Sequence, residues 1–272
     1  MVYANWVIFM KKVFTIVEEV MHNVVRLSIN KSAFTLAEVL VTLGIIGVVA
    51  AMTLPMLAKN YQFYVRQQQF KKVYAAMSIA AQKTQIDLGE GVRCHYSYKT
   101  NDIDNYSYSA ADCNFFFSEL AKNLQIIKHC ERKPYEGLCL PKDLKGGDII
   151  YAESQGGEDK EAAKEYFSGY CTAFTSGHMQ SINAVYLVNS GFYFMPFHWS
   201  TKKHIPLFLV DVNGHKGPNK WGHDVFIFEF YKAHKNDSVF KINASKRCHP
   251  IEEGGYYTTH FMEYLYGRST DL

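Results

Sequence analysis

The sequence lacks the short motifs that mark common nucleotide-binding and hydrolytic sites. It has no glycine-rich phosphate loop and no Gly-x-Ser-x-Gly nucleophile elbow, and no pair of carboxylates stands out as a general acid and base. It also lacks a Cys-x-x-Cys or His-x-x-x-His pair. Zinc ligands usually occur in such pairs, so Cys171, His178, Cys248 and His249 give only a weak zinc pattern. These absences leave catalysis unsupported, and we expect a protein that is not an enzyme.

The chain also has little net charge, +3 over 272 residues. Part of that excess comes from Lys11, Lys12, Arg26 and Lys31 near the start, so the rest is nearly neutral. Phosphate binding needs clustered positive charge. Nucleic acid is therefore not expected as the main partner, although a local basic patch would still allow it.

What the chain does contain is enough apolar material for a folded domain. Its residues are 48% apolar and 20% charged, a mixture typical of globular proteins. The positions after residue 90 number about 180, which is the usual size of one domain. We expect one globular domain behind one anchor.

The anchor is a run of 20 residues without a charge, from Val39 to Ala58. A helix of that length spans about 30 Å, the thickness of the hydrocarbon layer of a membrane. One carboxylate, Glu38, stands directly before the run. A charge there costs a few kcal/mol unless it finds a partner, and such residues are usually functional. Basic residues flank both ends, so the positive-inside rule does not fix the orientation.

The stretch "AFTLAEVLVTLGIIGVVAAMTLP" resembles the N-terminus of type IV prepilins and of the pseudopilins of type II secretion systems. The resemblance implies cleavage between Ala33 and Phe34 by a prepilin peptidase, which also acts as the N-methyltransferase of Phe34. It implies that Glu38 meets the Phe34 amine of a neighbouring subunit during assembly. Gly47 and Pro55 fall where many pilins carry a Gly and a Pro, and we expect a kink there. Ala33 departs from the pattern, since the family usually has Gly before the cut.

The same resemblance implies a division of the chain and a location. Residues 1–33 would be a cytoplasmic leader, and a start at Met21 would shorten it to the usual length. Residues 34–57 would be the membrane and assembly helix, 58–89 its amphipathic continuation, and 90–272 an extracytoplasmic domain. The protein would sit in the inner membrane by a single pass and then enter a surface or periplasmic filament. Its expected partners are other pilin or pseudopilin subunits, the peptidase, the inner-membrane assembly platform and membrane lipid.

Two other interpretations stay open. The first is a membrane-tethered module whose outward domain captures DNA or a secreted substrate without polymerising. The second is a soluble secreted protein, released by signal peptidase near Ala51, where small residues resemble a cleavage site.

The region after Pro55 predicts a second half of the same helix, and then a mixed domain. Apolar residues recur every three or four positions from Phe70 to Leu88, before Gly89 and Gly91. A second helix is expected within "DCNFFFSELAKNLQIIKHC" and a short one at 159–167. Strands are expected on both sides of the Asn189–Gly191 turn and in "HIPLFLVDVNG" and "DVFIFEFY". The predicted fold is α+β and pilin-like, with the long helix packed on an antiparallel sheet of three to five strands.

The cysteines suit an exported domain. All six follow the apolar run, and disulfides persist outside the cytosol. Cys130 and Cys139 are close enough in sequence to bridge, but spacing alone does not fix the pairing of the others. The six candidates for disulfides are Cys94, Cys113, Cys130, Cys139, Cys171 and Cys248.

One loop motif stands out, "DVNGHKGPNKWGHD", between two predicted strands. Asp211, Asn213 and Asp224 offer the oxygen ligands that calcium prefers, and three glycines let the loop fold tightly. Some pseudopilins bind calcium in a C-terminal loop. However, Lys216 and Lys220 lie in the same loop, and a purely structural turn is the favoured interpretation. Calcium is the one cofactor that the sequence suggests.

Overall fold

The structure is a computed structural model, and it describes residues 36–89, 110–155, 159–181, 184–196, 207–231 and 241–265. The chain divides into two compact units, of which the first ends at Tyr61 and the second begins at Gln62. Each unit is described by itself below.

The first unit is the N-terminal part of helix α2 (Leu36–Leu88). This is the one described helix that is long and apolar enough to cross a membrane, and its most apolar window has a mean hydropathy of 2.3. Side chains such as Leu40, Ile46 and Leu54 are exposed rather than packed in a protein core. Helix α2 is continuous through Gly47 and Pro55, and the kink expected there stays a prediction.

The second unit begins with the rest of α2, which carries the predicted apolar stripe. Phe70, Val73, Met77 and Ala81 are almost completely buried, and Thr84 at the end of the stripe is buried as well. The helix ends at Leu88, and Gly89 follows with a positive φ of 68°. Glycine tolerates that conformation and so allows the helix to stop there.

The sheet has six strands, β1 (Ile126–Cys130), β2 (Val185–Val188), β3 (Tyr193–Pro196), β4 (Leu207–Asp211), β5 (Val225–Tyr231) and β6 (Lys241–Ala244). Every neighbouring pair is antiparallel, and the spatial order is the chain order. The α+β architecture and the hairpin around Asn189–Gly191 are thus confirmed. The expected three to five strands were too few, since β1 and β6 were not predicted.

The second predicted helix was too long at its C-terminal end. Helix α3 (Ala110–Lys122) ends before β1, which the prediction had included in the helix. The spacing of Leu124 and Ile127 fits a helix, but Ile126 pairs with Val188 of β2. The two β-branched isoleucines favour extended backbone, and pairing with a buried neighbour strand outweighs the apparent helical period.

The remaining helices are α4 (Gly147–Ser154), α5 (Lys160–Cys171), the 3₁₀ helix η1 (Thr172–Phe174), α6 (Ser176–Ser181) and α7 (Thr258–Leu265). Helix α5 contains most of the short helix expected at 159–167. It begins after Asp159, whose side chain accepts a hydrogen bond from the Ala162 amide at 2.9 Å and caps the helix. The other four elements were not predicted.

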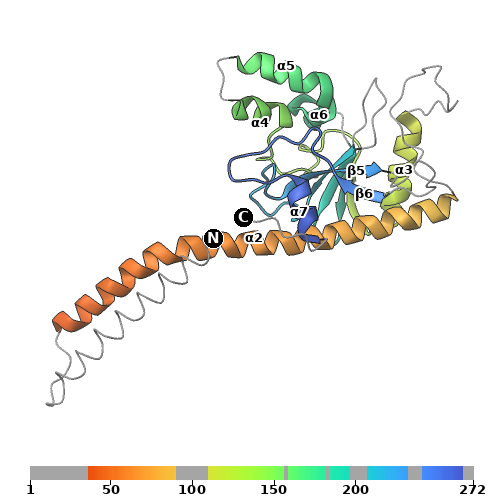
Figure 1. Ribbon diagram of the computed structural model, residues 1–272. Helices are drawn as coiled ribbons and strands as arrows, with labels where there is room; N and C mark the ends of the chain where they lie inside the picture. Colours follow the sequence, from red (N-terminus) through yellow and green to blue (C-terminus); the bar gives the residue numbers. More distant parts are fainter. Residues whose placement is uncertain are drawn as a thin grey trace. The chain divides into compact units, whose positions relative to one another are not determined.

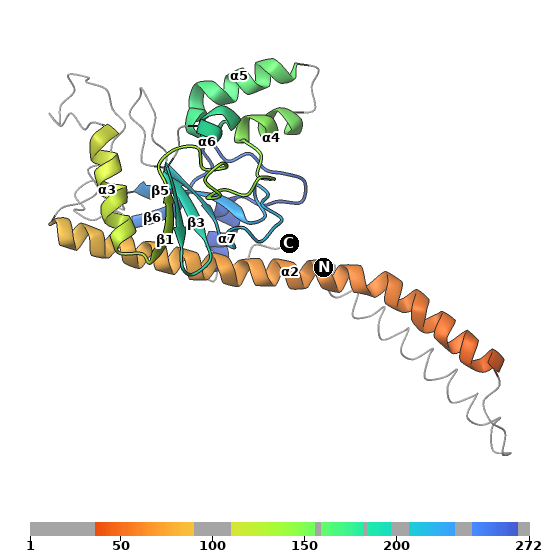
Figure 2. The ribbon, with the colours of Figure 1, turned by 180° about the vertical axis from the view of Figure 1, so that it is seen from behind.

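Phenylalanine rings join α2 and α3 to one face of the sheet. The Phe70 ring contacts those of Phe226, Phe228 and Phe261, with centroid distances of 5.1, 5.4 and 5.2 Å. Phe117 of α3 contacts Phe208 on the same face. Helices α4, α5 and α6 gather on the side of the domain away from residues 62–88 of α2 (Figures 1 and 2). Such aromatic pairs add about 0.5–1.5 kcal/mol each beyond the area they bury.

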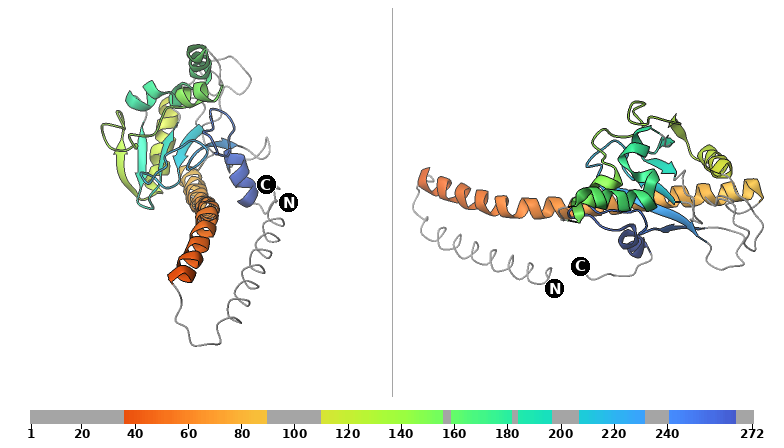
Figure 3. Two further views of the ribbon diagram at one scale, coloured as in Figure 1. Left: turned by 90° about the vertical axis from the view of Figure 1, so that its left-hand side faces the viewer. Right: turned by 90° about the horizontal axis from the view of Figure 1, so that it is seen from above.

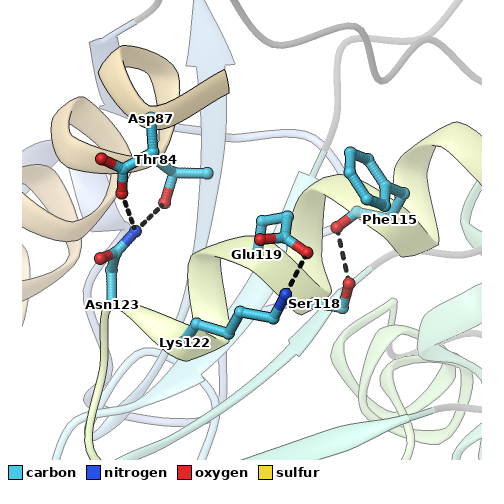
Figure 4. A network of polar contacts seen from close by, with 7 residues as sticks. All are labelled: Thr84, Asp87, Phe115, Ser118, Glu119, Lys122 and Asn123. Atoms are coloured by element: carbon cyan, nitrogen blue, oxygen red, sulfur yellow. Dashed lines mark hydrogen bonds and ion pairs between the residues drawn. The ribbon is translucent and has the colours of Figure 1, made fainter. Parts of the chain in front are cut away.

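A polar contact fixes the end of α3 beside the end of α2 (Figure 3, right). The side-chain amide nitrogen of Asn123, Nδ2, donates to Thr84 Oγ1 at 2.9 Å and to Asp87 Oδ2 at 3.3 Å (Figure 4). Thr84 is buried and also donates to the Ala80 carbonyl at 2.8 Å. Its hydroxyl is therefore satisfied both as donor and as acceptor, as a buried polar group should be.

Two disulfides lie in the described part of the chain. One joins Cys130 to Cys139, nine residues apart, and the other joins Cys171 to Cys248, 77 residues apart. Cys94 and the side chain of Cys113 lie outside the described residues. The second bridge connects α5 to the segment that follows β6.

Candidate functional site

The predicted processing site, Ala33 and Phe34, lies outside the described residues. Glu38 is described and stands in the first turn of α2, where its negative charge is favourable beside the positive end of the helix dipole. The hydroxyl of Thr42 donates to the Glu38 carbonyl at 3.0 Å, which satisfies a polar side chain inside the apolar run. In the sequence, Glu38 stands four residues after Phe34.

The loop between β4 and β5 brings the three predicted ligand residues together. Asp211 is the last residue of β4, and Asp224 directly precedes β5. The Asn213 amide nitrogen donates to Asp211 Oδ1 at 3.0 Å, and its side chain donates to Asp224 Oδ2 at 3.2 Å. Both aspartates are completely buried.

Asp224 holds the loop closed. Its Oδ1 accepts a hydrogen bond from the Lys220 amide at 2.7 Å, and its Oδ2 accepts one from the Asn219 amide at 2.9 Å. Hydrogen bonds to a charged acceptor are among the stronger ones in proteins. This role is structural, and it agrees with the turn that the sequence favoured.

Other oxygens of the loop are left without a donor. Asp211 Oδ2, Asn213 Oδ1 and Asn219 Oδ1 are buried and accept no hydrogen bond of good geometry from the described residues. The backbone amides of Asn213 and Gly214 and the Tyr193 hydroxyl act to lower the Asp211 pKa, but the Tyr193 hydroxyl does not reach full hydrogen-bond geometry. Buried oxygens without a donor are costly, and a cation is one way to satisfy them.

The pKa shifts of the two aspartates also favour a bound cation. Burial, and then the charge of Asp224, raises the pKa of Asp211 well above its usual value. Burial also raises the pKa of Asp224, although its hydrogen bonds oppose that rise. A nearby positive ion would stabilise both carboxylates in their charged form.

The structure adds residues that the sequence did not single out. Asn219 has a positive φ of 53°, and its side chain donates to both oxygens of Asp143, at 2.8 and 3.0 Å. Gly214 also has a positive φ, and a Cβ there would lie 2.4 Å from the Gly191 carbonyl oxygen. The turn residues predicted the loop itself. Nothing in the local sequence predicted the contact of Asn219 with Asp143, which lies 76 residues before it.

A histidine connects the loop to α2. Arg66 Nη1 lies 2.9 Å from His223 Nδ1, and His223 Nε2 lies 2.9 Å from the Glu253 carbonyl oxygen. A guanidinium only donates, so Nδ1 must accept and Nε2 must carry the proton. Burial, with the Arg66 charge as a further cause, lowers the pKa of His223. The neutral histidine therefore bridges α2 and the 252–256 segment.

The weak zinc pattern finds no support among the described residues. Cys171 and Cys248 are joined to each other, so neither thiolate is available to a metal. The described ranges contain no group of three or more His, Cys, Asp or Glu side chains placed to hold an ion. Any ion at the 211–224 loop would thus rely on amide and carbonyl oxygens beside the two carboxylates.

Comparison with known proteins finds a family motif in the N-terminal segment. Residues 29–54 match the family described as "Prokaryotic N-terminal methylation motif". No curated protein and no solved structure matches the chain. The motif is the hallmark of the prepilin-type signal of type IV pilins and pseudopilins, and it implies processing by a prepilin peptidase and assembly with other pilin subunits.

Proposed function

We propose that this protein is the precursor of a filament subunit of a type IV pilus or a type II secretion-type pseudopilus. The observation that carries the proposal is the methylation motif at residues 29–54, which overlaps an apolar helix and precedes an α+β domain. Residues 34–57 would insert in the inner membrane and later pack against the same helices of neighbouring subunits. The protein would act by assembly and not by catalysis.

The location of the domain follows from the same proposal. A leader that stays in the cytoplasm places the C-terminal domain on the outer side of the inner membrane. The disulfides Cys130–Cys139 and Cys171–Cys248 suit that side, because thiols in the cytosol are kept reduced. The assembly platform of the inner membrane would then draw the subunit into a filament.

Mass spectrometry of the mature N-terminus tests the proposal. We expect a mature chain that begins with N-methylated Phe34 in cells with an active prepilin peptidase, and an uncut chain in cells without it. Phe34 retained behind Ala33 in both strains would contradict the proposal, as would an N-terminus near Met52, which signal peptidase would leave.

We also propose that the 211–224 loop binds calcium. The supporting observation is the set of buried oxygens without a donor on Asp211, Asn213 and Asn219, beside the Asp224 carboxylate. Calcium prefers such oxygens, and binding to the folded state alone raises the melting temperature by mass action. The ion would lock the loop between β4 and β5.

Thermal melting of the full chain in detergent tests this second proposal. After treatment with a chelator, added calcium should raise the melting temperature, whereas magnesium at the same concentration should raise it much less. Asp211→Asn should remove most of the calcium-dependent rise. An unchanged melting temperature at saturating calcium would reject the metal and leave the loop as a hydrogen-bonded turn.

A further inference from the structure

A cavity of about 710 Å³ is lined in part by α4 and α5. These two helices lie on the side of the domain away from residues 62–88 of α2 (Figure 1). Helices α4 and α5 form one wall, and the segment 246–251 that follows β6 forms the other. The Cys171–Cys248 disulfide joins the two walls. Cavities of this size hold small ligands, and a covalent tie keeps the walls in place before a ligand arrives.

Tyrosine rings line much of this cavity. Tyr151, Tyr166, Tyr170 and Tyr257 all contribute. Tyr166 and Tyr170 stand one helical turn apart on α5, are 60% and 57% exposed, and have ring centroids 5.2 Å apart. An exposed tyrosine offers a flat apolar face and a hydroxyl at its edge. Ser154 and Gln155 add further hydrogen-bonding groups.

The charge of the cavity has one sign. Lys246 and Arg247 line it, and none of the described residues that line it is acidic. Lys246 Nζ lies 5.8 Å from the centre of the Tyr257 ring, which holds the ammonium group at the cavity wall. His249 adds no charge near neutral pH, because burial lowers its pKa to about 4. Two exposed cations therefore face a neutral, aromatic surface.

We propose that this cavity binds an acidic sugar, such as a uronic acid unit of an anionic polysaccharide. One apolar face of the sugar ring would lie on Tyr166 or Tyr170. Its carboxylate would pair with Lys246 and Arg247, and its hydroxyl groups would bond to the tyrosine hydroxyls, Ser154 and Gln155. Arginine suits this role because its planar guanidinium binds a carboxylate through two hydrogen bonds.

The arrangement favours a sugar over a strand of nucleic acid. A single strand needs a groove with cations spaced along its phosphates, and affinity grows with the number of phosphates neutralised. Here the two cations are neighbours in one loop, and no other described residue that lines the site is a lysine or an arginine. One charged ring with many hydroxyl groups fits this chemistry better.

Calorimetry on the full chain tests the proposal, in micelles of a detergent that contains no sugar. The probes are trigalacturonate, the neutral sugar maltotriose, and a short oligo-dT strand. We expect trigalacturonate to bind at least about tenfold more tightly than maltotriose, a gap of about 1.4 kcal/mol. The preference should shrink as salt screens the exposed charges.

Exposed residues supply variants that should leave the fold intact. Tyr166→Ala and the double variant Lys246→Gln with Arg247→Gln should each weaken trigalacturonate binding about tenfold or more, equal to about 1.4 kcal/mol. Tyr166→Phe keeps the ring and should retain most of the affinity. Two matched controls outside the cavity, Tyr64→Ala and Lys128→Gln, should bind as the unaltered protein does.

Three binding results with the unaltered protein would overturn the proposal. They are no heat of binding at millimolar trigalacturonate, equal affinity for maltotriose, or tighter binding of oligo-dT than of trigalacturonate. Equal losses in the control variants would also overturn it, because they would show a general charge or folding effect. None of these results bears on processing at Phe34.

Discussion

Asp211 and Asp224 show how two buried carboxylates in one loop can have opposite effects on stability. Asp224 accepts backbone hydrogen bonds from Asn219 and Lys220, whereas one oxygen of Asp211 has no full hydrogen bond and its charge repels Asp224. Hydrogen bonds therefore compensate the burial of Asp224 better than that of Asp211. Among the buried loop oxygens without a donor, Asp211 Oδ2 is the one that belongs to a carboxylate.

Neutralising Asp211 should therefore stabilise the protein when calcium is absent. We expect Asp211→Asn to raise the free energy of unfolding by about 1–2 kcal/mol in a chelator, since it removes a desolvated charge but keeps the acceptor for the Asn213 amide. Asp224→Asn should instead cost about 2 kcal/mol, because its new NH₂ group faces hydrogen-bond donors. Urea unfolding of both variants measures the contrast, and equal signs would contradict it.

His249 gives the folded state a dependence on acid. Burial is the main cause that lowers its pKa from 6.5 to about 4, so the unfolded state binds a proton more readily than the folded state. Its contribution to stability is complete above pH 6.5 and is lost as the pH falls toward 4, by about 3 kcal/mol in total. The raised pKa values of Asp211 and Asp224 act in the opposite direction, since their protonation favours the folded state.

Comparison with His249→Gln isolates this histidine, because both proteins keep the aspartates. Urea unfolding at pH 7 and pH 4.5 should show a larger loss in the unaltered protein than in His249→Gln. Parallel losses would mean that His249 titrates in the folded state as it does in the unfolded state.

At the level of elements, the two disulfides should contribute different amounts to the free energy of unfolding. In the chain-entropy account, a bridge stabilises more when it closes a longer loop. The spacing of 77 residues for Cys171–Cys248 predicts a loss of about 4.5 kcal/mol when both are changed to serine, and the spacing of nine for Cys130–Cys139 predicts about 2.6 kcal/mol. Denaturant unfolding of the two double variants tests that order, which would be contradicted if the short bridge proved the more important.

The elements also show what the sequence could predict. The stripe from Phe70 to Leu88 and strands β4 and β5 could be predicted, because a buried face repeats at the period of its own backbone. The spacing of Leu124 and Ile127 predicts helix where strand β1 lies, because the strand partner of Ile126, Val188, is about 60 residues away and leaves no local signal. Short strand β6 has only four residues and an exposed Lys241 at its start, so its local pattern is weak.

The candidate site could also be predicted only in part from the sequence. Turn residues identified the loop and three of its polar groups. Its contacts with Asp143 and Arg66 come from distant segments that only the folded chain brings near. Local composition therefore finds loops, and tertiary structure decides which oxygens in them stay without a donor.

At the level of the whole molecule, the proposed assembly role of Glu38 can be tested separately from membrane insertion. We expect Glu38→Val to leave the protein in the membrane, since it removes a charge from an apolar segment, but to reduce its recovery in filaments about tenfold or more, a loss of about 1.4 kcal/mol in coupling. Thr42→Val, one turn away, is the matched control and should assemble normally. Sheared filaments quantified against the membrane fraction give the measurement, and normal incorporation of Glu38→Val would show that the carboxylate does not guide assembly.

The six-stranded sheet has a consequence for how the domain is made. Because spatial order equals chain order, each strand can pair with the strand before it as soon as it arrives, and none must enter between two strands already joined. Local pairing of this kind lowers the entropy cost of closing the chain. The exception is Phe70, whose partners Phe226 and Phe261 come more than 150 residues later. A chain interrupted partway through synthesis would thus hold a growing sheet before the last side chains that cover its first described helix have been made.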